Sequence, residues 1–316
     1  MASRRRPKRA AEMGDRVFEA LCRVVSGEVR AREPMARHTT FRIGGEARYF
    51  IRCDSLSDLS GALHVLEMTG LEWVALGRGS NVLVSDAGWP GAVIVLGQDF
   101  RRHRVDGAHL EAGGGSLLAQ LVQDAYAKGL SGLEFAVGIP GTLAGALAMN
   151  AGDRERWIGT IVESVTLFDL GTGLTALRGS EVDWGYRRSN LSDRGIIVEA
   201  VLKVAEADRD TIRFAMDGSL RRRKRTQPVG AACAGSVFVN PAGDSAGRLI
   251  EAAGLKGTRI GGAVVSDVHA NFIVNERNAR AADVVALVQL IMNTVRDRYG
   301  IELKPEISFL GAFEES

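Results

Sequence analysis

Glycine clusters beside apolar segments constrain this chain more than any other feature of its sequence. Of its 316 residues 38 are glycine, whereas glycine makes up about 7% of an average protein. Many stand at Gly44–Gly45, Gly77 and Gly79, Gly113–Gly115, Gly138 to Gly152 and Gly261–Gly262. Glycine lets a backbone turn with positive φ or approach another group closely. The pattern predicts backbone folded against a ligand, and a phosphate-bearing cofactor is one such ligand.

The composition, 46% hydrophobic and 25% charged, is that of a folded globular protein. No apolar run approaches the roughly 18 residues that a membrane-spanning helix needs. Residues 1–16 hold six basic and two acidic side chains, and no apolar stretch follows them. We therefore predict a disordered basic tail over 1–16 rather than a secretory signal. The net charge of the whole chain is only +2, so the residues after the tail have a slightly negative net charge. A negative net charge disfavours nucleic-acid binding.

The cysteines and histidines predict neither a disulfide framework nor a metal site. Cys22, Cys53 and Cys233 form no CxxC pair, and the five histidines form no HxH or HxxxH pair. An odd number of scattered cysteines fits a reducing compartment, so we expect a cytoplasmic protein. The expected metal content is none.

Hydrophobic periodicity predicts helices and strands that alternate irregularly. The predicted helices cover 17–30, 58–70, 117–128, 208–226 and a stretch with Val284, Leu287, Val288, Ile291 and Val295 on one face. HTTFRIGGEARYFIRC (38–53) is predicted as a turn followed by a strand. Further predicted strands include 92–97, 162–170, 195–206, GSVFVNP (235–241) and EISFLG (306–311), with 184–190 as a loop. Without regular βαβ spacing, the fold class is α+β rather than a doubly wound sheet. A domain boundary is expected near 207–226, where a charged helix follows the strands.

Two glycine segments carry the strongest ligand signal. GRGSN, Gly77 to Asn81, joins two strands and offers backbone N–H groups and a hydroxyl to an anion. Val82 stands where a dinucleotide fingerprint has its third glycine, so a plain turn between strands is the alternative. GIPGTLAGALAMNAG, Gly138 to Gly152, suits a backbone wrapped against an extended ligand or a helix packed through small residues. These observations leave both choices open.

Seven motifs in order narrow the choice. They are HTTFRIGG, LGRGSNVLVSD, FAVGIPGTLAGALAMNAG, GYRRSN, AGSVFVNP, AGLKGTRIGGAVVSDVHANFIVN and KPEISFLG, from His38 to Gly311. With these seven motifs, the chain resembles the UDP-N-acetylenolpyruvoylglucosamine reductases, which are flavoproteins of peptidoglycan precursor synthesis. The resemblance implies a two-part FAD-binding region of the vanillyl-alcohol-oxidase-like (PCMH) type, over 17–100 and 101–207. It also implies a substrate-binding α+β domain over 208–316.

The resemblance also assigns site residues. It implies non-covalent FAD held by Gly77, Arg78, Gly79, Ser80, Asn81, Gly138, Ile139, Pro140, Gly141, Thr142, Gly145, Asn150, Ala151 and Gly152. It implies three catalytic residues, Arg187, Ser236 and Glu306, and contacts to a nucleotide-sugar substrate from Tyr186, Lys224, Asn240 and Lys256. The short stretch between Arg187 and Lys224 is typical of the subclass without a tyrosine loop over the substrate.

The implied reaction reduces the enolpyruvyl ether of UDP-N-acetylglucosamine-enolpyruvate to UDP-N-acetylmuramate. NADPH reduces FAD in the same cleft, so no separate nicotinamide motif is expected. Arg187 would bind the substrate carboxylate, Glu306 would stabilise the enolate and Ser236 would protonate the α carbon. We expect no nucleic-acid, membrane or obligate protein partner.

Two alternatives remain. The first is another FAD-dependent oxidoreductase of the same fold. The second is a nucleotide-binding regulatory module or nucleic-acid binder that uses the basic run from Arg221 to Arg225.

Overall fold

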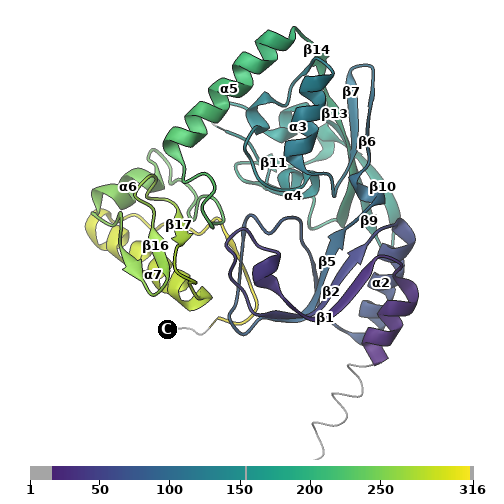
Figure 1. Cartoon of the computed structure of the whole chain (residues 1–316), viewed down its shortest axis with the longest axis horizontal. Helices are drawn as coiled ribbons and strands as arrows, with labels where there is room; N and C mark the ends of the chain where they lie inside the picture. The colour runs from purple at the N-terminus through teal and green to yellow at the C-terminus, as the bar shows by residue number, and fades with distance from the viewer. Residues whose placement is uncertain (1–15, 154, 314–316) are drawn as a thin grey trace, which may run out of the picture.

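The computed structural model describes residues 16–153 and 155–313. It shows a body built on two sheets, beside which lies a smaller lobe carrying α6 (Ala246–Ala252) and α7 (Ala281–Tyr299) (Figure 1). The long helix α5 (Arg209–Thr226) runs from the body towards this lobe. Residues 1–15 of the predicted tail lie outside the described residues, and residue 16 lies in a helix.

The first sheet has the order β1-β2-β5-β3. Its strands are β1 (Glu28–Pro34), β2 (Glu46–Cys53), β5 (Trp89–Leu96) and β3 (Trp73–Ala75). Helix α2 (Leu56–Thr69) begins at the cap Ser55, whose side chain accepts from the N–H of Asp58, and ends at Gly70 with φ 61°. Leucines of α2 share a buried core with residues of β2 and β5. The α2 bounds confirm the predicted helix.

The helix predicted over 17–30 is wrong in its second half. Within the described residues this helix covers 16–24, and the chain continues as β1, antiparallel to β2. Asp58 explains the break, because its carboxylate accepts from the N–H groups of Ser26 (3.1 Å) and Gly27 (3.1 Å) and from the Ser26 hydroxyl. The apolar helical stripe also ends at Val25, so strand pairing outweighs helix propensity beyond it.

The second sheet is antiparallel throughout, in the order β10-β9-β13-β7-β6. Its strands are β10 (Gly173–Arg178), β9 (Val162–Asp169), β13 (Ile196–Lys203), β7 (His109–Gly113) and β6 (His103–Asp106). Helices α3 (Leu118–Ala127) and α4 (Leu143–Ala148) share its core, and α5 adds Ile212 and Met216. A short pair, β8 (Leu130–Ser131) with β14 (Ala205–Glu206), lies beside α5.

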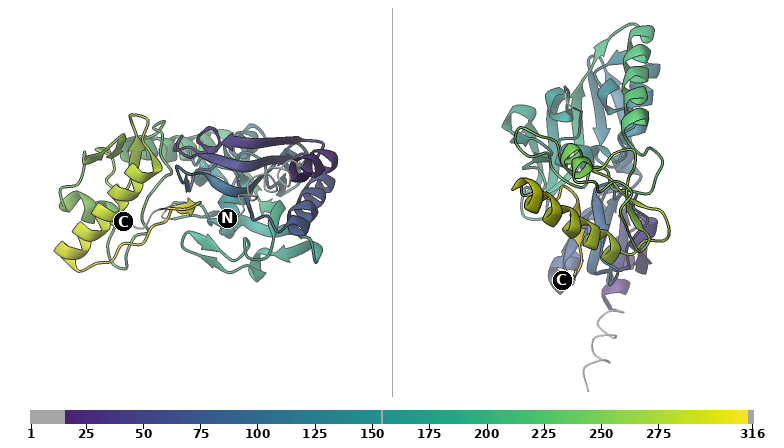
Figure 2. Two further views of the ribbon diagram at one scale, coloured as in Figure 1. Left: turned by 90° about the horizontal axis from the view of Figure 1, so that it is seen from below. Right: turned by 90° about the vertical axis from the view of Figure 1, so that its left-hand side faces the viewer.

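The lobe packs its helices on a three-stranded antiparallel sheet of β15 (Arg259–Ile260), β16 (Ala263–Val265) and β17 (Ile273–Asn275). The predicted apolar face of α7 is confirmed, since all five of its residues are buried. The chain then returns to the body, where β18 (Ser308–Leu310) pairs in parallel with β4 (Val82–Val84). Figure 2 shows this yellow strand against the body.

The strand predicted for GSVFVNP is wrong, because this segment forms no ladder of hydrogen bonds with another described strand. Only an isolated bridge joins Phe238 to Pro305. Three successive N–H groups find three separate acceptors: that of Val237 donates to the Asn271 backbone oxygen, that of Phe238 to the Asn271 side chain, and that of Val239 to the Lys304 oxygen. Such mixed partners hold an extended segment without a neighbouring strand. Among the described residues, none of the helices is long and apolar enough to cross a bilayer.

We expect Asp58→Ala to destabilise the fold by about 2 kcal/mol or more, because it leaves several part-buried N–H groups unpaired. The cap Asp208, which accepts from the Thr211 N–H at an exposed site, provides the control. Asp208→Ala should cost only about 1 kcal/mol. The urea unfolding midpoints of the two variants measure both effects, and an equal loss of stability in both would contradict the prediction.

Asp58 should also make stability depend on pH. Burial raises its pKa, but hydrogen bonds from the Ser26 and Asp54 N–H groups outweigh it, so the pKa lies below the usual value. Its contribution is therefore complete above the unfolded pKa of about 3.9 and is lost as pH falls through the lower folded value. Urea midpoints measured at decreasing pH should show the Asp58→Ala difference shrink.

Candidate active site

The two glycine segments of the sequence meet in space. Gly77 to Asn81 joins β3 to β4, and Gly138 to Thr142 leads into α4. The Ser80 hydroxyl donates to the Pro140 carbonyl across a distance of 3.2 Å. A Cβ at Gly77 would lie 2.5 Å from Oγ1 of Thr142, so only glycine allows the loops to approach this closely. Both loops thus border one site.

Backbone donors accumulate where these loops meet. Within 16–153 and 155–313, no acceptor is found for the N–H groups of Gly77 to Asn81, nor for those of Gly141 and Thr142. The buried hydroxyl of Ser116 also lacks a partner there, and its backbone oxygen accepts from the N–H of Leu143. Clustered backbone N–H groups form a concave anion site. The residues therefore fit a cofactor diphosphate, as the sequence predicts for FAD.

Arg187 stands on a tight hairpin rather than on the predicted loop. β11 (Trp184–Gly185) pairs with β12 (Arg188–Ser189), which leaves Tyr186 and Arg187 as the two turn residues. The φ of Arg187 is 58°, a left-handed conformation that is rare for a residue with a side chain. The Asn150 side chain donates to the Gly185 oxygen (2.9 Å), and Nη1 of Arg187 donates to the Gly152 oxygen (3.1 Å). Asn150 and Gly152 therefore orient this hairpin.

Glu306 faces Arg187. The Arg187 Nε lies 3.3 Å from Oε1 of Glu306, whose side chain is only 11% exposed. Burial raises the pKa of Glu306 to about 7, although the neighbouring guanidinium acts to lower it. The backbone oxygen of Glu306 accepts from the side-chain amide of Asn81 at 3.0 Å. Asn81, predicted as a cofactor residue, thus ties the glycine loop to the segment of Glu306.

Ser236 lies on the segment beside Glu306. The N–H of Glu306 donates to the oxygen of Val237 at 2.7 Å. Ser236 also lines a cavity of about 270 Å³ together with Asn240, Arg248 and His269. The described residues show no hydrogen bond from the Ser236 side chain to Arg187 or Glu306. The structure therefore brings the three predicted catalytic residues onto adjoining segments, with Arg187 and Glu306 in direct contact.

Two of the four predicted substrate contacts touch each other. The Asn240 amide donates to the Tyr186 hydroxyl at 3.1 Å, and the Arg187 guanidinium lies 5.3 Å from the Tyr186 ring centre. Lys256 pairs with Glu251 at 2.8 Å. Lys224 is exposed on α5, and no contact from it to these residues occurs in the described part of the chain.

Arg223 is a site residue that the sequence argument missed. It is half-buried, and its side-chain Cδ lies 3.2 Å from the position of a Cβ on Gly138. Burial lowers its pKa, with a smaller lowering from the charge of Arg187. The buried residues Ile212 and Met216 define the inner face of α5. Because 7 and 11 residues are close to two and three full turns of a helix, the stripe of Ile212 and Met216 continues to Arg223 rather than to Lys224.

The basic run on α5 is not a continuous solvated patch. Arg222 pairs with Asp153 across to the body, and Arg223 is half-buried. This leaves less free charge than the sequence suggests for binding nucleic acid.

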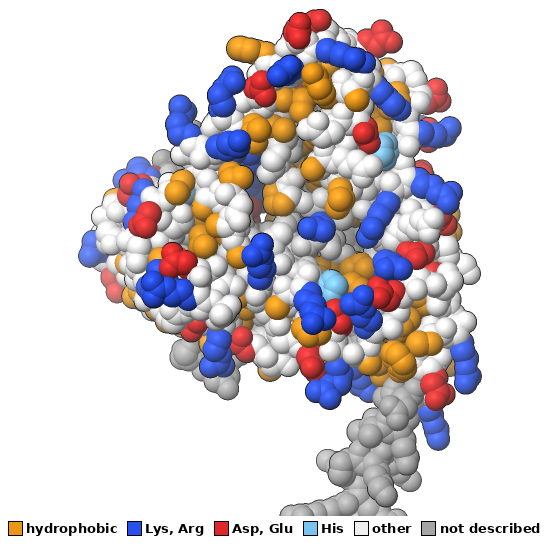
Figure 3. All heavy atoms as spheres, in the orientation of Figure 1, with side chains coloured by type: hydrophobic (Ala, Val, Ile, Leu, Met, Phe, Trp, Pro, Cys, Tyr) orange, Lys and Arg blue, Asp and Glu red, His pale blue; other side chains and the backbone are white. Residues whose placement is uncertain are grey.

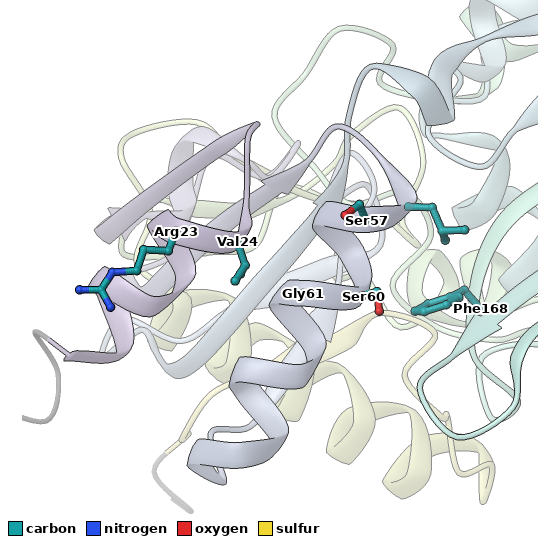
Figure 4. A pocket seen from close by; sticks show the side chains of 7 residues that line it. Arg23, Val24, Ser57, Ser60, Gly61 and Phe168 are labelled. Carbon is teal, nitrogen blue, oxygen red and sulfur yellow. The ribbon is translucent and has the colours of Figure 1, made fainter.

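Pocket size does not locate this site. A larger pocket of about 700 Å³ lies on the outside of the body, between the first helix, α2 and β9 (Figure 4). Its lining, which includes Arg23, Ser57, Ser60 and Phe168, holds none of the predicted site residues. The space-filling view is instead hollowed where the lobe meets the body (Figure 3). The convergence of loops and charged side chains identifies the site.

Comparisons with known proteins agree with this geometry. A model of the UDP-N-acetylenolpyruvoylglucosamine reductase C-terminal domain matches residues 227–310, and an FAD binding domain model matches 47–175. UDP-N-acetylenolpyruvoylglucosamine reductase of Bacillus licheniformis is 42% identical over 300 residues, which cover 94% of this chain and 99% of the relative. The chain belongs to this reductase family. The reductase of Heliobacterium modesticaldum is 44% identical over 287 residues, 90% of this chain and 91% of the relative.

A solved structure supports the fold. The crystal structure of the reductase from Thermus caldophilus superposes with a TM-score of 0.80 at 37% identity, covering 90% of this chain and 99% of that chain. The predicted α+β fold, an FAD-binding region followed by a C-terminal domain, is confirmed. In the part of the chain that the structure describes, no three His, Cys, Asp or Glu side chains gather as metal ligands.

We predict that Gly79→Ala lowers FAD content. Gly79 has φ 58°, and a Cβ there would lie 2.4 Å from the backbone oxygen of His38, so the loop must shift. Gly107 has φ 56° with open space around it, which makes Gly107→Ala a control with the same backbone strain and no clash. The ratio of flavin to protein, read by absorbance after purification, should fall only for Gly79→Ala. An equal loss in both variants would contradict the prediction.

Proposed function

We propose that this chain reduces the enolpyruvyl ether of UDP-N-acetylglucosamine-enolpyruvate to UDP-N-acetylmuramate, with Arg187, Glu306 and Ser236 as its catalytic residues. The partly buried Arg187–Glu306 pair beside the two glycine loops is the observation that carries this assignment. As a member of the reductase family, the chain is an FAD-dependent oxidoreductase of peptidoglycan synthesis that takes its electrons from NADPH. Reduced FAD, when bound, supplies the hydride for the vinyl CH₂ of the substrate.

Arg187 would bind the substrate carboxylate. Its planar guanidinium offers several donors in a fork that matches a carboxylate, and the Gly152 oxygen engages only Nη1. As electrons enter the double bond, negative charge builds at the α carbon and spreads into this carboxylate. A fixed cation at that position stabilises the enolate more than the ground state.

Glu306 would act in its protonated form. Its raised pKa of about 7 keeps a large fraction neutral near pH 7, so its hydroxyl can donate a hydrogen bond to the developing enolate. An ionised Glu306 would instead repel the substrate carboxylate and compete for Arg187. The burial that raises the pKa thus has a chemical use.

Ser236 would donate the proton that completes the reduction at the α carbon. It lines the cavity beside Asn240 and lies on the segment bonded to Glu306. A serine hydroxyl is a weak acid, so its proton transfer depends on exact placement beside the charge-stabilising pair. We further propose that Tyr186, Asn240, Lys224 and Lys256 contact the nucleotide-sugar.

The predicted FAD residues remain part of this proposal. They are Gly77, Arg78, Gly79, Ser80, Asn81, Gly138, Ile139, Pro140, Gly141, Thr142, Gly145, Asn150, Ala151 and Gly152. The N–H groups of both loops that find no acceptor among the described residues support a diphosphate contact there. The domain limits 17–100, 101–207 and 208–316 are likewise proposed.

Ser236→Ala should separate the two half-reactions. Reduction of the flavin by NADPH needs no proton donor to substrate, so its rate should remain that of the wild type. Reoxidation by the enolpyruvyl substrate should slow by roughly 10²–10⁴, the usual range for a lost general acid. Stopped-flow absorbance on each half-reaction measures both rates. Equal slowing of both would make Ser236 a structural residue, and no slowing would remove it from the mechanism.

Glu306 should give the reoxidation rate its pH dependence. Because the protonated form is the active one, the rate should fall as pH rises through about 7. Glu306→Gln keeps a hydrogen-bond donor but cannot titrate, so this decline should disappear. Glu302→Gln alters an exposed carboxylate on the same segment and should keep the wild-type profile. A decline that persists in Glu306→Gln would assign the titration to another group.

A further inference from the structure

We propose that Asn271 is a positioning residue that sets Ser236 and Glu306 in register for the reaction. The inference rests on the proposed role of Ser236 as proton donor. Asn271 is 3% exposed and lies just before β17, far along the chain from both catalytic residues.

Three hydrogen bonds join Asn271 to the two residues that follow Ser236. Its side-chain Nδ2 donates to the oxygen of Phe238 at 2.8 Å, and its Oδ1 accepts from the N–H of Phe238 at 2.9 Å. Its backbone oxygen accepts from the N–H of Val237 at 2.8 Å. The Asn271 amide thus bonds both the N–H and the carbonyl oxygen of Phe238, two groups that would otherwise bond to the backbone of a neighbouring strand.

The same segment holds Glu306 on its other side. The oxygen of Val237 accepts from the N–H of Glu306 at 2.7 Å, and the N–H of Val239 donates to the oxygen of Lys304 at 2.9 Å. Since Ser236 and Glu306 belong to two segments bonded to each other, a shift of one changes its distance from the other. Asn271 anchors this pair of segments to the lobe.

The loop that carries Asn271 is itself braced. The N–H of Ser266 donates to the oxygen of Phe272, and the Ser266 hydroxyl accepts from the N–H of Val268 at 3.2 Å. The N–H of Asn271 donates to Nδ1 of His269 at 3.1 Å. Both the oxygen and the nitrogen of the Asn271 amide are bonded to the Phe238 backbone. The amide therefore holds this segment in position, and Asn271 acts through Ser236.

An amide is required because the position needs one donor and one acceptor. In Asn271→Asp the carboxylate still accepts from the Phe238 N–H, but its second oxygen opposes the Phe238 oxygen. Protonation of that carboxyl would restore a donor at the same place. The variant should therefore regain function as the pH falls, a readout that simple loss of packing would not give.

The test is stopped-flow absorbance on FAD-loaded Asn271→Asp, with each half-reaction followed from pH 5.5 to 8.5. Reoxidation by the enolpyruvyl substrate at high pH should be slowed by roughly 10²-fold, the effect of misplacing a reacting group by about 1 Å. The ratio of variant to wild-type rate should rise as pH falls. Flavin reduction by NADPH should keep its wild-type rate at every pH.

Asn275→Asp is the matched control. The Asn275 amide also bonds two backbone groups, donating to the oxygen of Phe41 at 2.9 Å and accepting from the N–H of Ala279 at 2.8 Å. Neither of these two backbone groups belongs to the segments of Ser236 and Glu306, and among the described residues neither is hydrogen-bonded to them. The control should therefore show no selective, pH-dependent loss of reoxidation.

Several outcomes would overturn the inference. They are wild-type reoxidation in Asn271→Asp, equal slowing of both half-reactions, a pH-independent defect, or the same defect in Asn275→Asp. Ser236→Ala in the same assay distinguishes a failure of this inference from a failure of the proposed function. If the flavin of Ser236→Ala is reoxidised at the wild-type rate, the proposed role of Ser236 as proton donor is wrong. If Asn271→Asp does not yield FAD-loaded protein, Asn271→Ser is measured instead. Its single hydroxyl cannot bond both Phe238 groups, so its reoxidation should slow selectively, and a wild-type rate would overturn the inference.

Discussion

The site depends on the return of the chain from the lobe to the body through residues 304–310. In this segment the Glu306 N–H bonds the Val237 oxygen, and the Ser308 N–H bonds the oxygen of Asn81. The Asn81 amide bonds the Glu306 oxygen, and β18 then pairs with β4. One extended segment therefore holds the Ser236 backbone on one side and the cofactor loop on the other. These bonds fix the distance between the loop from Gly77 to Asn81 and the segments of Ser236 and Glu306.

For both Arg187 and Glu306, an unfavourable contribution is balanced against a favourable contact in this site. The left-handed φ of Arg187 costs about 1–2 kcal/mol for a residue with a Cβ. Its bond to the Gly152 oxygen and its contact with Glu306 offset this cost and aim the guanidinium. Burial disfavours the charge on Glu306 more strongly than Arg187 favours it. The result is a donor-rich site with a carboxyl that can still be neutral near pH 7.

Local patterns in the sequence predicted some elements well and others poorly. The apolar stripe of α7 and the glycine end of α2 depend on neighbouring residues, so both were predictable. The helix over 17–30 and the strand at GSVFVNP failed because Asp58 and Asn271, distant in sequence, supply the hydrogen bonds that decide those segments. Family motifs placed Arg187 near Glu306. Whether Arg223 or Lys224 faces the site depends on which face of α5 is buried. The run of basic residues in the sequence does not indicate that face.

The return segment also explains why the core of the lobe is not confined to the C-terminal part of the sequence. Phe41, Ile43 and Leu83, all from the first glycine-rich motifs, are buried with residues of α6, α7 and β16. Thr40 donates through its hydroxyl to the Cys233 oxygen at 2.7 Å, just before Ser236. Residues flanking the loop from Gly77 to Asn81 therefore complete the core beside the Ser236 segment. Because the same residues stabilise both, order in the cofactor loop and order in the lobe are physically linked.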